Sequence, residues 1–76
     1  MTPQELNTHF TTLRENYRSV NVLVFDDCMV FSKVDNPKRT AEKINKIIQE
    51  LNLPLIAVSN ENNGLFSGTV RIEPKL

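Results

Sequence analysis

Apolar residues recur every three or four positions at the start of this chain. Spacings of four, three and four separate the members of one stripe: Leu6, Phe10, Leu13 and Tyr17. This is the period of one face of an α-helix, because 3.6 residues complete each turn. The pattern predicts an amphipathic helix over about residues 3–18, with its polar side in water.

A second stripe with the same period lies in the middle of the chain. Its members are Ala41, Ile44, Ile47, Ile48 and Leu51. Asn52 and Pro54 follow, and both residue types often stand just beyond a helix end. The pattern predicts a second amphipathic helix over about residues 37–51. The side chains from both stripes that we expect in the core are Phe10, Leu13, Ile44 and Ile48.

Both helices are preceded by residues that favour a helix start. Thr2 precedes Pro3, and Asp35-Asn36 precedes Pro37. Thr, Asn and Asp side chains accept hydrogen bonds from N–H groups of the first turn, and proline suits the first helical position. We therefore expect Thr2 to cap the first helix, and either Asp35 or Asn36 to cap the second.

Between the helices the pattern changes to β-branched and aromatic residues. Two strands are predicted, over residues 20–25 and 28–34, with Asp26-Asp27 as the tight turn between them. Because side chains alternate between the faces of a strand, a two-residue loop divides this hairpin into two apolar sets. One set is Val20, Val22, Val24, Met29 and Phe31, and the other is Leu23, Phe25, Cys28 and Val30.

A second hairpin is predicted after the second helix. Residues 55–58 form an apolar run that is typical of a short buried strand. The polar segment 60–64 ends in Asn-Gly, which favours a turn. The return strand is predicted over residues 65–72, in which Gly68 indicates a bulge.

The elements follow the order helix, strand, strand, helix, strand, strand. This order predicts an α+β two-layer sandwich, with two helices on one face of a four-stranded and largely antiparallel sheet. A chain of 76 residues is expected to form a single domain over residues 1–76. Since the helices can cover one face of the sheet, one apolar set of the first hairpin should stay exposed.

Charge and cysteine content restrict the function classes. Nine basic and nine acidic residues give a net charge of zero, so no net positive field attracts nucleic acid or anionic lipid. The single Cys28 excludes an intrachain disulfide and a cysteine-rich zinc site, and it favours a cytoplasmic location. No run approaches the about 20 apolar residues of a membrane span, and no leader is evident. We expect neither secretion nor membrane insertion.

Few residues are candidates for catalysis. Cys28 and His9 are the only thiol and the only imidazole, but Asp26 and Asp27 should raise the pKa of the thiol rather than activate it. The two aspartates have no third carboxylate or histidine nearby in the sequence, which favours a turn over a metal site. Two glycines cannot form a nucleotide-binding loop. We predict a protein that is not an enzyme and has neither a metal nor a cofactor.

One side of the second helix is basic. Arg39, Lys43 and Lys46 are spaced by four and three residues, so they share this side. They are candidate contacts for an anion or a nucleic acid. Glu42 stands four residues before Lys46, which is also the ordinary charge pattern of a solvated helix. Nucleic-acid binding through this basic side is the alternative function.

The leading hypothesis is a small protein-interaction or regulatory module, of the adaptor or inhibitor type, that acts by binding another protein. Its expected interface is the apolar set that includes Leu23, Phe25 and Val30, because large exposed apolar patches usually mark interfaces. Strands at a sheet edge also offer unpaired backbone groups to a second copy. We expect a homodimer, with a different protein on the same surface as the next choice.

Overall fold

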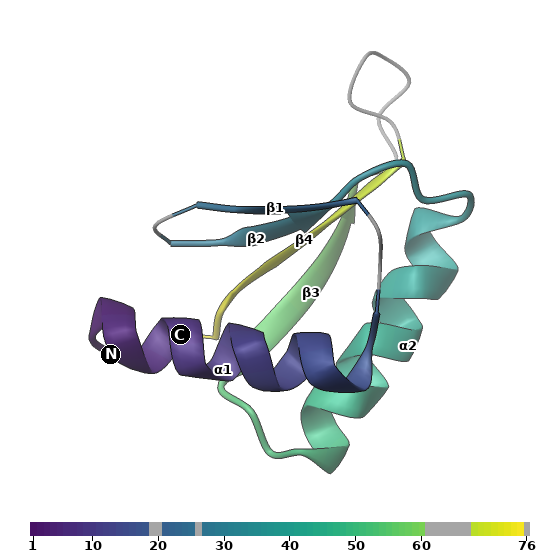
Figure 1. Cartoon of the computed structure of the whole chain (residues 1–76). Coiled ribbons are helices and arrows are strands. Elements are labelled where there is room, and N and C mark those ends of the chain that lie inside the picture. Colours follow the sequence, from purple (N-terminus) through teal and green to yellow (C-terminus); the bar gives the residue numbers. More distant parts are fainter. Residues whose placement is uncertain (19–20, 26, 61–67, 76) are drawn as a thin grey trace.

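The computed structural model describes residues 1–18, 21–25, 27–60 and 68–75. It contains two helices and four strands, in the order predicted from the sequence (Figure 1). The elements are α1 (Pro3–Asn16), β1 (Val22–Val24), β2 (Met29–Phe31), α2 (Pro37–Glu50), β3 (Leu55–Asn60) and β4 (Thr69–Pro74). The predicted α+β fold, with helices packed against an antiparallel sheet, is therefore confirmed.

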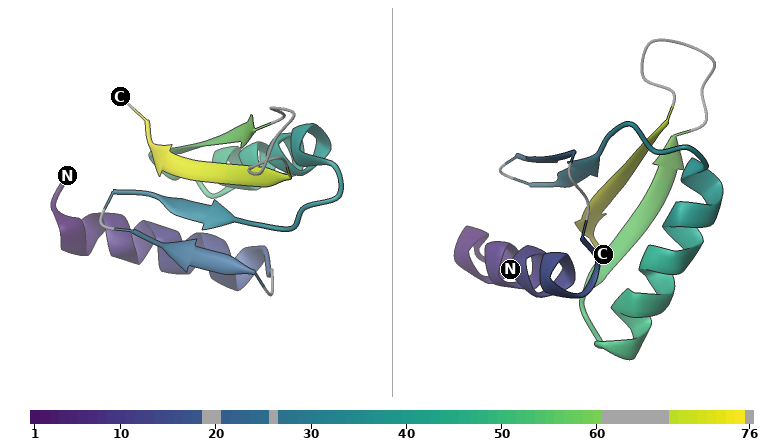
Figure 2. Two further views of the ribbon diagram at one scale, coloured as in Figure 1. Left: turned by 90° about the horizontal axis from the view of Figure 1, so that it is seen from above. Right: turned by 45° about the vertical axis from the view of Figure 1, so that its right-hand side comes forward.

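The strands form one antiparallel sheet in the order β1-β2-β4-β3, which Figure 2 shows from above. The last strand of the chain lies in the interior of the sheet, between β2 and β3. The two edges of the sheet are consequently β1 and β3. This strand order could not be read from the sequence, because every hairpin arrangement satisfies the same alternation of side chains.

The helix caps form as predicted. The Thr2 hydroxyl accepts a hydrogen bond of 3.2 Å from the Glu5 N–H at the start of α1. Asn36, not Asp35, caps α2, and its side-chain oxygen accepts a bond of 3.2 Å from the Arg39 N–H. Each helix ends within two residues of the predicted position.

The core lies between the helices and one face of the sheet. The four side chains predicted to be core are buried, together with residues of all strands except β1. The buried side chains are Leu6, Phe10, Leu13, Met29, Phe31, Ala41, Ile44, Ile48, Leu55, Ala57, Val70 and Ile72. Leu51 belongs to the predicted stripe but is exposed, because it follows the last turn of α2. Tyr17 packs on Phe31, with ring centroids 5.6 Å apart.

The strands of the first hairpin are shorter than predicted. Each has three residues, and two residues after β2 ends the φ of 56° at Lys33 takes the chain out of the extended conformation. Gly68 stands just before β4 rather than within it, so it is not a bulge inside that strand. Its φ of +85° and the Val34 carbonyl oxygen, which would lie 3.0 Å from an added Cβ, together require glycine. Val20, Asp26 and the turn predicted over residues 60–64, apart from Asn60, lie outside the described residues.

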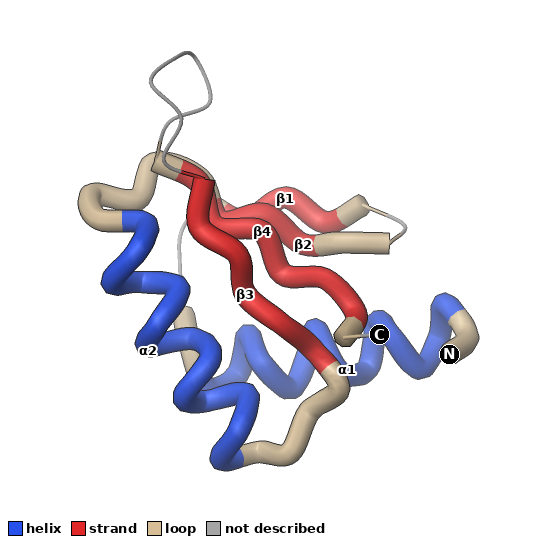
Figure 3. Tube along the Cα trace, turned by 180° about the vertical axis from the view of Figure 1, so that it is seen from behind, coloured by secondary structure: helices blue, strands red, loops and turns tan. Residues whose placement is uncertain are grey.

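A side chain of α2 covers the outer edge of β3. The Asn45 amide donates a hydrogen bond of 2.9 Å to the Ala57 carbonyl, and its oxygen accepts one of 2.8 Å from the Ala57 N–H. Figure 3 shows α2 running beside β3. Asn45 therefore occupies the position that another strand would take, and it satisfies both backbone groups of Ala57 on this edge.

Replacing Ile44 by alanine should lower the free energy of unfolding by about 2–5 kcal/mol, because Ile44 is completely buried and the change leaves a cavity. Urea denaturation followed by circular dichroism measures this loss. Ile56→Ala is the matched control, since Ile56 lies largely outside the core, and it should lose clearly less. Equal losses for the two variants would contradict the assignment of the core.

Replacing Asn45 by alanine should lower the free energy of unfolding by about 1–3 kcal/mol, because it removes both partners of the Ala57 backbone groups. Asn7→Ala makes the same change on the exposed side of α1 and should cost less. The comparison uses the same denaturant titration for both variants. A loss for Asn45→Ala no greater than for Asn7→Ala would show that the edge contact does not contribute to stability.

Candidate functional site

The face of the sheet that points away from the core is covered by no helix in the part of the chain that the structure describes. We call this the open face. Strand register places one cross-strand row on it, from β1 through β2 and β4 to β3: Leu23, Val30, Arg71 and Val58. The alternation of side chains adds a second row: Phe25, Cys28, Glu73 and Ile56.

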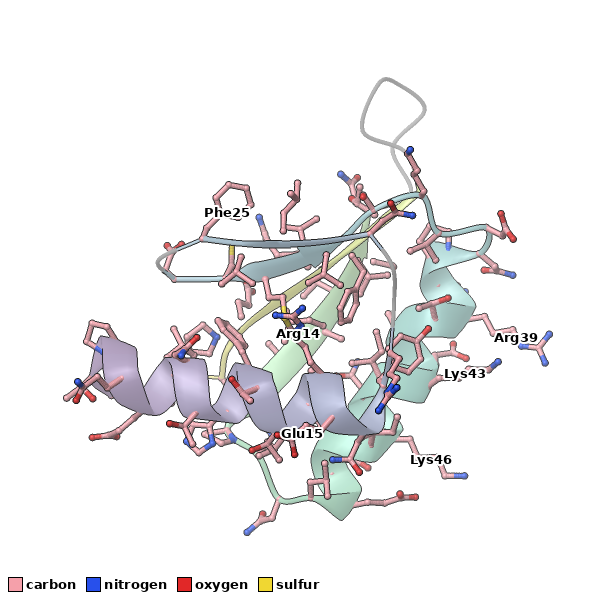
Figure 4. The ribbon with its side chains drawn as sticks, in the orientation of Figure 1. Arg14, Glu15, Phe25, Arg39, Lys43 and Lys46 are labelled. Carbon is pink, nitrogen blue, oxygen red and sulfur yellow. The ribbon has the colours of Figure 1, made fainter. Side chains whose placement is uncertain are left out.

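The structure brings the three predicted interface residues together on the open face. Leu23 and Phe25 are more than half exposed, and Val30 is half-buried beside them. Phe25 projects from the tip of the hairpin, on the side away from α1 (Figure 4). Three large apolar side chains of the first hairpin therefore adjoin one another outside the core.

The sequence prediction missed the contribution of β3 to this face. The run over residues 55–58 was expected to be buried, but Ile56 and Val58 are 37% and 38% exposed, while Leu55 and Ala57 are buried. The prediction is wrong because a continuous apolar run suggests cover on both faces. In the structure β3 is covered on one face only, and its other face adds a second apolar group to the open face, separated from the first hairpin by β4.

An ion pair occupies the interior of the open face. The Arg71 Nε lies 3.1 Å from the Glu73 Oε2, and both residues belong to β4. Both side chains remain accessible to water, so the pair contributes at most about 1 kcal/mol to stability. Its structural effect is to place one positive and one negative group between the apolar residues of β3 and those of the hairpin. The sequence prediction had assigned these two residues no role.

The environment of Cys28 disfavours a reactive thiolate. Burial raises the pKa of the Cys28 thiol, and the negative charge of Asp27 raises it further. The Arg71 guanidinium acts in the opposite direction but does not reverse the shift. A protonated thiol is a weak nucleophile. None of the hydrogen bonds found among the described residues joins Cys28 to His9 on α1.

The three basic residues of α2 also share one exposed side, as predicted. Arg39, Lys43 and Lys46 all project away from the sheet (Figure 4). In the described ranges none of them is in an ion pair, although Glu42 stands four residues before Lys46. Arg39 and Lys43 also line a shallow hollow of about 490 Å³, to which Lys33 adds a third cation and Asp35 an anion.

Other kinds of site are not found in the described parts of the chain. No three His, Cys, Asp or Glu side chains gather there in a way that could hold a metal ion. Neither described helix has the length and apolar character that a membrane crossing requires. Comparisons of this chain with protein-family models, with curated proteins and with solved structures find no match.

The raised pKa of Cys28 predicts slow alkylation by iodoacetamide at neutral pH, with a rate that increases as the pH rises through the thiol pKa. Asp27→Asn removes a charge that raises this pKa, so at pH 8 the variant should react several times faster than the native protein. Mass spectrometry measures the rate. Asp35→Asn is the control and should leave the rate unchanged. A rate unaffected by Asp27→Asn would contradict the electrostatic explanation.

Proposed function

We propose that this protein is a small non-enzymatic module, regulatory in character, that acts by binding another protein through the open face. The observation that carries the proposal is the set of exposed apolar side chains that the first hairpin and β3 place on one sheet face: Leu23, Phe25, Ile56 and Val58. Burial of apolar surface is the main driving force of protein association. Exposed apolar side chains on both sides of the Arg71–Glu73 pair, on one face of so small a domain, are therefore best explained as a contact surface.

The ion pair gives this surface a means of selecting its partner. Typical interfaces have an apolar centre with a few polar groups that fix the orientation of the partner. On the open face Arg71 and Glu73 are those groups. A partner with an acidic group opposite Arg71 and a donor opposite Glu73 would satisfy both, whereas a uniformly apolar partner would leave two charges buried without additional partners.

We also propose that the protein is located in the cytoplasm and that it associates with a second copy of itself. A lone cysteine with a protonated thiol fits a reducing cytoplasm, where disulfides are rare. A second copy of the chain is the first partner that we propose, because the exposed residues 23–25 of the hairpin are uncharged and can contact their own copies. A different protein can bind the rest of the open face at the same time.

The basic side of α2 supports one alternative function, the binding of nucleic acid. Three cations project together into solvent, and none of them is in an ion pair within the described segments. Phosphate groups are the ligands that such a row would contact. The zero net charge of the chain argues against strong binding of this type.

The double substitution Ile56→Lys with Val58→Lys should abolish retention of a partner protein from a lysate of the native host, because it places two charges on the open face. The matched control, Lys43→Ala with Lys46→Ala, removes two charges from α2 and should retain the partner. Circular dichroism verifies that both variants fold. The nucleic-acid alternative would replace this proposal if only the α2 variant failed to retain what the native protein binds, and if the affinity of the native protein fell steeply with salt concentration.

A further inference from the structure

Three consecutive residues at the outer strand of the first hairpin are exposed. Leu23, Val24 and Phe25 have exposed fractions of 56%, 49% and 54%. Neighbouring side chains of a strand point to opposite faces. Exposure of all three therefore cannot result from one uncovered face alone. The part of the hairpin near its turn, including its outer edge, is open to solvent.

The backbone of β1 has hydrogen-bonding groups directed away from the sheet. The Phe25 N–H donates to the Cys28 carbonyl, and the Ser32 N–H donates to the Asn21 carbonyl. In an antiparallel ladder, alternate residues bond to the same neighbour. Leu23 accordingly bonds toward β2, while Val22 and Val24 direct their N–H and C=O groups outward. Among the described strands β1 pairs with β2 alone, so these four groups have no strand partner.

The two edges of the sheet differ in their protection. Asn45 covers the centre of the β3 edge through both backbone groups of Ala57. Natural proteins protect exposed edges with charged residues, proline or covering elements, because a free edge pairs readily with another strand. Residues 22–25 contain neither a charge nor a proline. Apart from its short length of three residues, the β1 edge therefore has none of these protections among the described residues, whereas Asn45 covers the centre of the β3 edge.

We infer that the β1 edge binds a second copy of this chain, so that two four-stranded sheets join into one of eight strands. The two β1 strands pair antiparallel about a two-fold axis that passes beside Leu23. In this register Val22 of each copy faces Val24 of the partner subunit as a hydrogen-bonded pair. All four outward groups of each β1 strand are then satisfied, and the two Leu23 side chains meet on the open face. The inference rests on the proposed function, because it names the first partner of the hairpin.

Charge distribution along the hairpin favours the antiparallel arrangement. Its turn end carries the exposed Asp27, and its other end, where the chain enters and leaves, carries the exposed Arg18, Lys33 and Asp35, two positive charges and one negative. Antiparallel pairing of two copies brings the acidic end of each hairpin toward the basic end of the other. Parallel pairing would bring like charges together. The second copy is therefore complementary in charge as well as in backbone hydrogen bonds.

A hollow beside β1 provides apolar contacts for the same partner. About 240 Å³ of space lies between the first half of α1 and the end of β1, and residues lining it include Leu6, Phe10 and Val24. In the inferred register Val22 of the partner subunit lies opposite Val24 and on the same side of the sheet. It would cover this hollow, and the packing adds to the four backbone hydrogen bonds.

The first experiment removes one outward N–H group. Val24→Pro deletes a donor that does not belong to the β1–β2 ladder, and proline is tolerated in an edge strand when its nitrogen faces solvent. In sedimentation equilibrium the native protein should show twice the chain mass of 8.7 kDa at micromolar concentrations. The dissociation constant of Val24→Pro should be at least tenfold higher. A native mass of one chain up to millimolar concentration would overturn the inference.

The second experiment tests the register and does not depend on how well the proline variant folds. Residues opposite each other in a non-hydrogen-bonded pair have Cα atoms about 4.5 Å apart, which suits a disulfide. Leu23→Cys, in a Cys28→Ser background, should form a disulfide-linked dimer under mild oxidation. Ile56→Cys in the same background is the control and should remain mainly monomeric. Equal cross-linking of both variants, or none for Leu23→Cys, would contradict the inferred pairing.

Two variants already described distinguish this inference from the proposed function: Ile56→Lys with Val58→Lys, and Val24→Pro. Ile56→Lys with Val58→Lys alters the open face near the β3 edge, so it should leave the dimer intact while it abolishes retention of a different protein. Val24→Pro should have the converse effect. A dimer that dissociates in the first variant but not in the second would show that the copies meet face to face rather than edge to edge, and would exclude the inferred register.

Discussion

Two helices of 14 residues each provide the cover that a four-stranded sheet receives in the described structure. A domain of this size can form one hydrophobic core, and a two-layer arrangement places that core on one side of the sheet. Burial of the strand residues follows from this constraint. Leu55 and Ala57 on β3 are buried, whereas their neighbours Ile56 and Val58 are not. The side chains of the opposite face are not needed for the core, so they can contact a partner protein.

The same constraint explains the different treatment of the two edges. The α2 helix lies against β3, close enough for Asn45 to bond to its backbone. No comparable side chain of α1 reaches β1 among the residues described, and the edge residue Val24 remains half exposed although it faces the covered side. The protein therefore presents one closed edge and one open edge. The inferred pairing uses the β1 edge alone, and two such edges related by a two-fold axis form a closed pair rather than an extended chain of copies.

Most of the helices and strands could be predicted from the sequence, but less of how they pack against one another could be. Helix bounds were predictable because the apolar period and the caps at Thr2 and Asn36 agree. The exposure of Leu23 and Phe25 was predictable because both faces of the hairpin are apolar. Strand order was not, since pairing depends on contacts between distant segments. In the sequence Asn45 looks like an ordinary solvated helix residue, and its contact with β3 is visible only once the packing of α2 on β3 is known. Likewise, the strand register is needed to see that Arg71 lies opposite Val58.

The position of β4 has a consequence for how the chain reaches this state during synthesis. Among the six elements β4 leaves the ribosome last, yet it lies between β2 and β3 and joins them into one sheet. Until it arrives, the first hairpin and β3 have no strand pairing in common, and Val70 and Ile72 are missing from the centre of the core. The nascent chain therefore cannot acquire its structure stepwise from the first helix onward. Folding is expected as one late, cooperative event after β4 has emerged.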